Sequence, residues 1–138
     1  MMSSIAARVL VQGTASGPVL VLEEPLSFWG GVDPSSGNII DRRHPQHGRL
    51  VTGTVMVMPH GRGSSSSSYV LAELIRGRIG PAGIVTAEPD PIIVLGSLVA
   101  AELYPDRRCP VVVVSERYSD LQQATHVVIQ PDGTIEAT

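Results

Sequence analysis

The segment LVTGTVMVMPHGRGSSSSSYVLAELIR, residues 50–76, decides the class of fold. Its first nine residues, 50–58, are rich in β-branched and other apolar side chains and predict a strand. Apolar side chains then recur at the spacing of a helix, at Val70, Leu71, Leu74 and Ile75. A serine at the start of this helix can cap the free amides of its first turn, and Gly77 and Gly80 end it. A strand that runs directly into a helix is typical of α/β folds.

The flanking sequence extends this alternation in both directions. Strands are predicted at 7–12, 18–22, 83–86 and 109–114, a helix at 91–104, and a closing hairpin of residues 125–130 and 134–136 around Pro131-Asp132-Gly133. This order predicts a single α/β domain, residues 1–138, with a β-rich half. A chain of 138 residues is too short for two full-sized domains.

The composition describes a globular, weakly acidic chain. Hydrophobic residues make up 43% of the sequence, which excludes disorder as the main description. The formal net charge is −3, and all ten Lys or Arg positions hold Arg. Because no basic patch is visible, nucleic acid is not expected as a partner. The absence of lysine excludes a P-loop lysine, a Schiff-base lysine and a lysine general base on this chain.

Cys109 is the only cysteine of the sequence. A lone thiol forms no internal disulfide and cannot hold an iron–sulfur cluster, which needs about three or four thiolates. Because Cys109 begins an apolar strand, we expect an inert buried thiol. The N-terminus lacks the pattern of a signal peptide, and the longest apolar stretch, 91–103, is too short and too interrupted to span a bilayer. A soluble cytoplasmic protein without membrane contact is therefore expected.

The run GRGSSSSS, residues 61–68, is the strongest candidate site. Glycines let the backbone approach a ligand closely, and a helix N-terminus favours anions. Arg62 adds a planar fork suited to a carboxylate or phosphate. A flexible serine linker or a plain helix cap is the alternative, although the strand before the run and the helix after it argue against a linker. The run matches neither a P-loop nor a GxGxxG fingerprint.

Two other segments carry weaker signals. The stretch 24–49 is much longer than an ordinary connection, as functional loops often are. Its His44 and His47 are too few ligands to indicate a metal site, and His47 is interpreted as a surface residue. His60, beside the glycines, could line a pocket. Asp90 precedes a predicted helix and is interpreted as its N-cap, with a ligand-facing role as the alternative.

Four blocks, in this order, resemble a known family. They are EPLSFWGGVDP at 24–34, Ile40-Asp41 with His44-Pro45, GRGSSS at 61–66 and DPII at 90–93. On these blocks the chain resembles the small-subunit, swivel-domain part of aconitase X. The resemblance implies a swivelling β/β/α domain like the fourth domain of aconitases. It also implies a two-subunit dehydratase, a hydro-lyase, whose large subunit carries the iron or iron–sulfur cluster and most substrate ligands.

The resemblance further implies a reaction, the loss of water from a hydroxy acid. Its implied substrates are cis-3-hydroxy-L-proline in bacterial members and (R)-5-phosphomevalonate in archaeal members. In aconitase relatives the serine of a Gly-Ser-Ser-Arg segment accepts the proton, and Ser64 is the matching residue here, while Ser66 stands in place of the arginine. The expected substrate-binding residues are Arg62, Gly61, Gly63 and Ser65. The Arg-rich, Lys-free composition suggests a high-GC bacterial source and favours the hydroxyproline.

The chemistry of the residues agrees with this expectation. A serine is a poor base unless its alkoxide is stabilised, and helix amides together with Arg62 supply that stabilisation. No cofactor or metal is expected on this chain, and iron on the partner would act as a Lewis acid on the departing hydroxyl. Two other classes stay open. One is a non-catalytic swivel module that regulates a larger partner, in which Ser64 is dispensable, and the other is a small-anion-binding domain without a partner.

Overall fold

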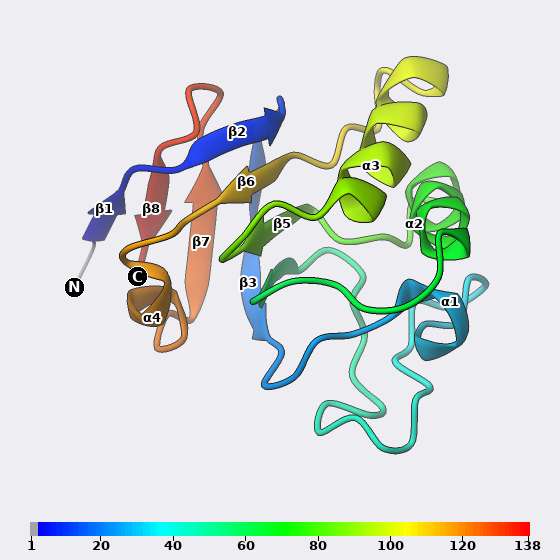
Figure 1. The fold of residues 1–138 in the computed structure, drawn as a ribbon. Coiled ribbons are helices and arrows are strands. Elements are labelled where there is room, and N and C mark those ends of the chain that lie inside the picture. Colours follow the sequence, from blue (N-terminus) through cyan, green and yellow to red (C-terminus); the bar gives the residue numbers. More distant parts are fainter. Residues whose placement is uncertain (1–2) are drawn as a thin grey trace.

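The computed structural model describes residues 3–138. Its central feature is a mixed sheet of eight strands. The strand order is β1-β8-β7-β3-β4-β5-β6-β2 (Figure 1). The strands are β1 (Ser3–Ile5), β2 (Arg8–Val11), β3 (Ala15–Val21), β4 (Val55–Met58), β5 (Gly83–Thr86), β6 (Val111–Val113), β7 (His126–Ile129) and β8 (Ile135–Ala137). The helices are α1 (Phe28–Gly31), α2 (Ser66–Arg76), α3 (Pro91–Leu103) and α4 (Tyr118–Leu121).

The sheet has a parallel half and an antiparallel half. Strands β3, β4, β5 and β6 are parallel, with Leu20 opposite Met56, Met56 opposite Ile84 and Ile84 opposite Val111. Strands β7, β8 and β1 continue the sheet antiparallel beyond β3, and β2 pairs antiparallel with β6. This arrangement confirms the predicted α/β class with a β-rich half.

The two faces of the parallel strands are buried by different elements. Met56 and Met58 face a core that contains Leu71 and Leu74 of α2, whereas Val55 and Val57 face a second core built with β7 and β8. Figure 1 shows α2 and α3 together on one side of the sheet and the antiparallel strands curling away on the other. Burial on both faces explains why β4 and β6 are continuously apolar rather than alternating, and why every residue of β5, including Thr86, is buried.

Several sequence predictions are corrected by the structure. The predicted strand 50–58 is too long, because residues 52–53 form a turn in which Gly53 has φ of +70°, and Leu50 makes only an isolated β-bridge with Asn38. The predicted strand 109–114 is shorter in the structure, where β6 spans only Val111–Val113. Helix α2 ends at its C-cap Gly77, as predicted, but the left-handed residue that follows the cap is Arg78, with φ of 62°, rather than a glycine. The short elements β1, α1 and α4 carried too few residues for a periodic signal.

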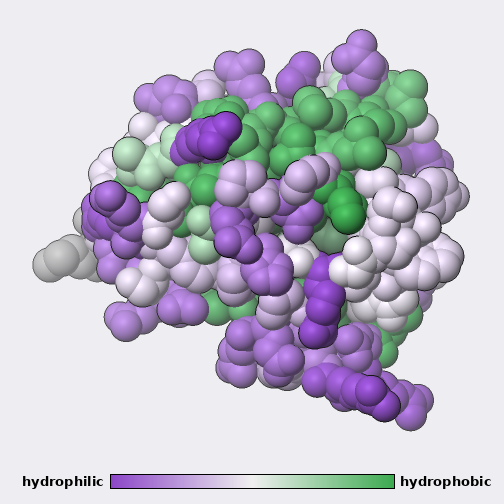
Figure 2. All heavy atoms as spheres, in the orientation of Figure 1, coloured by the Kyte–Doolittle hydropathy of each residue, from purple (hydrophilic) through white to green (hydrophobic). Residues whose placement is uncertain are grey.

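Helix α3 presents an apolar outer surface. Leu95, Leu98, Val99 and Leu103 are exposed along it. Figure 2 shows hydrophobic residues gathered over the upper part of the molecule, where α3 lies in Figure 1. None of the helices within residues 3–138 has the length and apolar character needed to cross a membrane.

Gly96 is the point where α3 touches the first turn of α2. A Cβ atom at residue 96 would lie 2.7 Å from the Ser68 carbonyl oxygen and 3.1 Å from the Ser68 Cα. We expect Gly96→Ala to destabilise the chain by about 1–3 kcal/mol through overpacking, measured by chemical denaturation. Helix propensity alone predicts the opposite sign, a gain of about 1 kcal/mol.

Gly77→Ala is the matched control for this substitution. A Cβ at Gly77 meets nothing closer than 3.5 Å, and the residue has φ of −78°. The control should therefore leave stability close to that of the wild type. Equal or higher stability of Gly96→Ala would show that α2 and α3 do not need this close approach.

Candidate active site

The candidate site forms where two neighbouring parallel strands end. Strands β4 and β5 are paired up to Met58 opposite Thr86, so the segments that follow them emerge at the same edge of the sheet. After β4 comes the glycine turn, defined here as residues 61–64, and after β5 comes the segment leading to Asp90. The candidate site therefore lies at the carboxyl edge of the parallel strands, the edge at which α/β sheets carry their ligand-binding segments.

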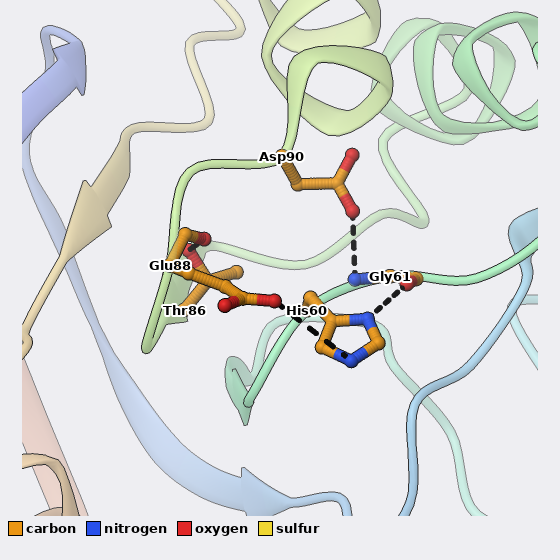
Figure 3. Close-up of polar contacts among 5 residues, drawn as sticks. All are labelled: His60, Gly61, Thr86, Glu88 and Asp90. Atoms are coloured by element: carbon orange, nitrogen blue, oxygen red, sulfur yellow. Dashed lines mark hydrogen bonds and ion pairs between the residues drawn. The ribbon is translucent and has the colours of Figure 1, made fainter.

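Asp90 joins the two segments. Its Oδ1 accepts hydrogen bonds from the amides of Ile92 (3.0 Å) and Ile93 (3.2 Å), which confirms the predicted N-cap of α3. Its Oδ2 accepts a hydrogen bond from the Gly61 amide at 2.7 Å (Figure 3). The Asp90 side chain also lines a small cavity. Asp90 therefore both caps α3 and borders the candidate site.

The other side of the glycine turn rests on the segment that precedes α1. The Arg62 amide donates to the Leu26 carbonyl at 3.2 Å. Gly63 has φ of +96°, and a Cβ there would lie 2.5 Å from the Ser27 Oγ. Glycine at 63 is therefore required both by the backbone conformation and by the close packing on Ser27.

Ser67 connects this support to α2. Its side chain is buried, and its Oγ lies 3.1 Å from the Ser27 Oγ and accepts from the Trp29 amide at 3.0 Å. Trp29 itself remains 56% exposed beside the site. Neither Ser27 nor Ser67 was singled out from the sequence, because the contact joins residues 40 positions apart.

The serine run is the ordered beginning of α2 and not a linker. The Ser66 amide donates to the Ser64 Oγ at 3.0 Å, so Ser64 supplies the side-chain cap. Ser65 occupies the N-cap position without a side-chain cap bond, and the Ser68 Oγ donates to the Ser65 carbonyl at 2.7 Å. The Ser64 side chain is exposed, with its oxygen next to the positive end of the helix dipole.

Arg62 borders two hollows. One is a narrow cavity of about 70 Å³ lined by Phe28, Gly61, Gly63, Asp90 and the neighbouring Leu26, Ser67, Ile92 and Ile93. The other is an open hollow of about 640 Å³ lined by Trp29, Arg43, Asp41 and the neighbouring Glu24, Ser27, Gly30 and Gly31. Within residues 3–138, no ion pair or hydrogen bond engages the Arg62 guanidinium. Of the predicted site residues, Gly61, Arg62 and Gly63 line the narrow cavity, and Arg62 alone of the five also borders the open hollow. Ser64 and Ser65 are exposed next to this turn and line neither hollow.

None of the three histidines considered as site residues, His44, His47 and His60, lines either hollow. His44 is buried, its Nδ1 accepts from the Gln46 amide at 3.0 Å, and its Nε2 therefore donates to the Glu24 carbonyl at 2.9 Å. His47 is exposed, as predicted. His60 bonds the Gly61 carbonyl through Nδ1, lies 4.0 Å from Glu88, and lines neither hollow (Figure 3). In the described part of the chain, no three His, Cys, Asp or Glu side chains are grouped to hold a metal.

Cys109 confirms the prediction of an inert thiol. It is 1% exposed, and burial raises the pKa of its thiol to about 12. The thiolate, which is the reactive form, is therefore negligible at neutral pH.

Residues 4–137 match the family model described as the aconitase X swivel domain. The chain belongs to the aconitase X swivel-domain family. The family resemblance inferred from the four sequence blocks is thereby confirmed, and so is the expected swivel-domain fold. A crystal structure of aconitase X from Thermococcus kodakaraensis superposes with a TM-score of 0.83 at 30% identity, covering 99% of this chain and 98% of that one.

Two curated relatives of this swivel domain are dehydratases. A cis-3-hydroxy-L-proline dehydratase of Pseudomonas aeruginosa is 49% identical over 85% of this chain. A phosphomevalonate dehydratase small subunit of Methanothermobacter thermautotrophicus is 44% identical over 75% of this chain and 79% of its own length. The chain spans only 20% of the Pseudomonas protein, so most of that protein has no counterpart here.

Proposed function

We propose that this aconitase X swivel domain is the small subunit of a two-subunit hydro-lyase that dehydrates a hydroxy acid, with cis-3-hydroxy-L-proline as the favoured substrate. The observation that carries the proposal is the exposed Ser64 hydroxyl at the start of α2, two residues after Arg62, whose guanidinium is unpaired within residues 3–138. The identity to the Pseudomonas dehydratase, 49% over 117 residues, favours the hydroxyproline.

Ser64 is the group that takes the proton in this proposal. Dehydration starts with removal of a C–H proton next to an electron-withdrawing group, and a base must stand at close range. A serine alkoxide at this place is stabilised by the Ser66 amide, which already donates to the Ser64 Oγ, and by the helix dipole. The proton of the substrate carbon passes to the Ser64 alkoxide while the C–H electron pair forms the new double bond and the β-hydroxyl leaves as hydroxide. The hydroxide takes up the proton from Ser64, which completes the loss of water and restores the alkoxide.

Arg62 and the backbone around it hold the anionic end of the substrate. The guanidinium borders both hollows and matches the geometry of a carboxylate. Gly61 and Gly63 carry no side chain that would keep a ligand away from the backbone, and Ser65 stands at the N-cap position of α2. The open hollow is large enough for a small hydroxy acid, whereas the narrow cavity of about 70 Å³ is not.

A partner is required for this chemistry. Ser64 and Arg62 are exposed, and an alkoxide in contact with bulk water is not stabilised enough to act as a base. We propose that a large subunit covers these two residues, excludes water and brings the iron or iron–sulfur cluster, for which residues 3–138 offer no ligand group. The Pseudomonas relative is about five times as long as the matched region, so most of its chain lies outside the part that this domain resembles.

A second substrate is supported by a specific observation. The Methanothermobacter relative is named a small subunit, and this chain covers 79% of it at 44% identity. Phosphomevalonate is therefore the alternative substrate, and its phosphate also suits Arg62.

The test is reconstitution with the large subunit. We expect the lone chain to show no dehydratase activity and the co-expressed pair to turn over one of the two compounds, followed by the absorbance or mass of the dehydrated product. Turnover of cis-3-hydroxy-L-proline supports the favoured substrate, and turnover of phosphomevalonate alone replaces it with the alternative. Activity of the isolated chain, or a pair that assembles and dehydrates neither compound, would contradict the proposal.

A further inference from the structure

We propose that Asp90 is a positioning residue, whose carboxylate fixes the glycine turn, and with it Ser64, to the first turn of α3. This inference rests on the proposed function, because it concerns the same hydroxyl. It adds Asp90, the N-cap of a different helix, α3. Asp90 does not hydrogen-bond Ser64 and does not line the open hollow.

The two oxygens of Asp90 contact different parts of the backbone. Oδ1 serves α3, accepting from Ile92 and Ile93 at 3.0 and 3.2 Å. Oδ2 serves the glycine turn, accepting from the Gly61 amide at 2.7 Å. An N-cap needs only one oxygen, so the second bond is not explained by capping. Figure 3 shows the carboxylate of Asp90 directed at the Gly61 nitrogen.

The bond to Gly61 holds one end of the turn that carries Ser64. The next amide, that of Arg62, is bonded to the Leu26 carbonyl at 3.2 Å, so two consecutive amides are held by two different segments. A Cβ at Gly61 would lie 2.7 Å from the Asp90 Oδ2, which shows how closely the carboxylate approaches this backbone. Loss of the bond would free the turn on the α3 side.

Small displacements of a reacting group have large kinetic effects. A misplacement of roughly 1 Å costs on the order of 100-fold in rate. Because Asp90 does not hold the substrate in this proposal, its loss should reduce kcat while KM changes little.

Asp90→Asn separates the two roles of the carboxylate. Asparagine caps helices about as well as aspartate, so its Oδ1 keeps the bonds to Ile92 and Ile93. Its Nδ2 is a donor and cannot accept the Gly61 amide. In the reconstituted pair we expect kcat to fall on the order of 100-fold with KM nearly unchanged. In the isolated full chain, amide hydrogen exchange should quicken at Gly61 and stay slow at Ile92 and Ile93.

Asp132→Asn is the matched control. Asp132 accepts the Thr134 amide at 2.9 Å in the hairpin between β7 and β8, away from the site, so the same chemical change is made to a comparable side-chain-to-backbone bond. Its turnover should equal that of the wild type. A second variant, Gly61→Ala, disturbs the same contact from the other side, and combined with Asp90→Asn its effect should be less than additive.

The outcomes distinguish this inference from the proposed function. Normal turnover of Asp90→Asn beside an inactive Ser64→Ala overturns the positioning role and leaves the proposed function standing. Faster exchange at Ile92 and Ile93 with unchanged exchange at Gly61 also overturns it, because Asp90 would then be only a cap. Normal turnover of Ser64→Ala overturns the proposed role of Ser64, and the positioning of Ser64 falls with it.

Discussion

Ser64→Ala in the reconstituted pair should lower kcat by about 10²–10⁴-fold, the usual contribution of a positioned acid–base group. KM should change little, because the hydroxyl acts on the proton in the transition state rather than on the bound ground state. The substitution also removes the acceptor for the Ser66 amide, so some loss of helix stability, about 1 kcal/mol, is expected. Steady-state kinetics on the pair, with assembly checked by size exclusion, measures the effect.

Ser68→Ala is the control for Ser64→Ala. Its Oγ also bonds a backbone group of the first turn, the Ser65 carbonyl, but it does not support the proposed chemistry. Ser67 is a poorer control, since its buried hydroxyl holds Ser27 and the Trp29 amide. A near-normal rate for Ser64→Ala would show that Ser64 is not the base and would favour a non-catalytic swivel module.

Arg62→Met should lower kcat/KM by about 10–100-fold, the cost of losing a hydrogen bond to a charged group. Most of this loss should appear in KM if Arg62 binds the anionic end of the substrate. Arg62→Lys keeps the charge but not the planar fork and should recover only part of the activity. Because the Arg62 backbone bond to Leu26 is unaffected, the fold of the turn should persist in both variants. Steady-state kinetics of the reconstituted pair measures both parameters.

Arg8→Met serves as the control, because Arg8 lies on β2, paired with β6 at the far edge of the sheet. It removes one positive charge without touching either hollow. A similar loss in Arg8→Met would mean that net charge, and not the position of Arg62, sets substrate affinity.

In the proposed function, this chain supplies only half of an active site. Arg62 and the exposed Trp29 line an open hollow, and the Ser64 hydroxyl is exposed two residues after Arg62. The Ser64 hydroxyl and the Arg62 guanidinium can serve catalysis only when a second surface excludes water, since a low dielectric strengthens their electrostatic interactions.

The sequence by itself determined the elements whose signals are local. The helical spacing of Val70, Leu71, Leu74 and Ile75 placed α2, the hairpin residues 131–133 placed β7 and β8, and Asp90 before a proline placed the cap of α3. Periodicity and capping act over a few residues, so a short stretch of sequence contains the information. The family resemblance pointed to Ser64 and its neighbours in the same way, through contiguous blocks.

Only the tertiary structure decided how these parts meet. The elements that cover the two faces of β4, one face carrying Met56 and the other Val57, are set by strand register and packing. The bond between Asp90 and Gly61, 29 residues apart, depends on them too. The pairing of Ser27 with Ser67 depends on them as well. No local pattern encodes such contacts, because each partner has many alternatives in the unfolded chain and the choice is made by burial of the whole core.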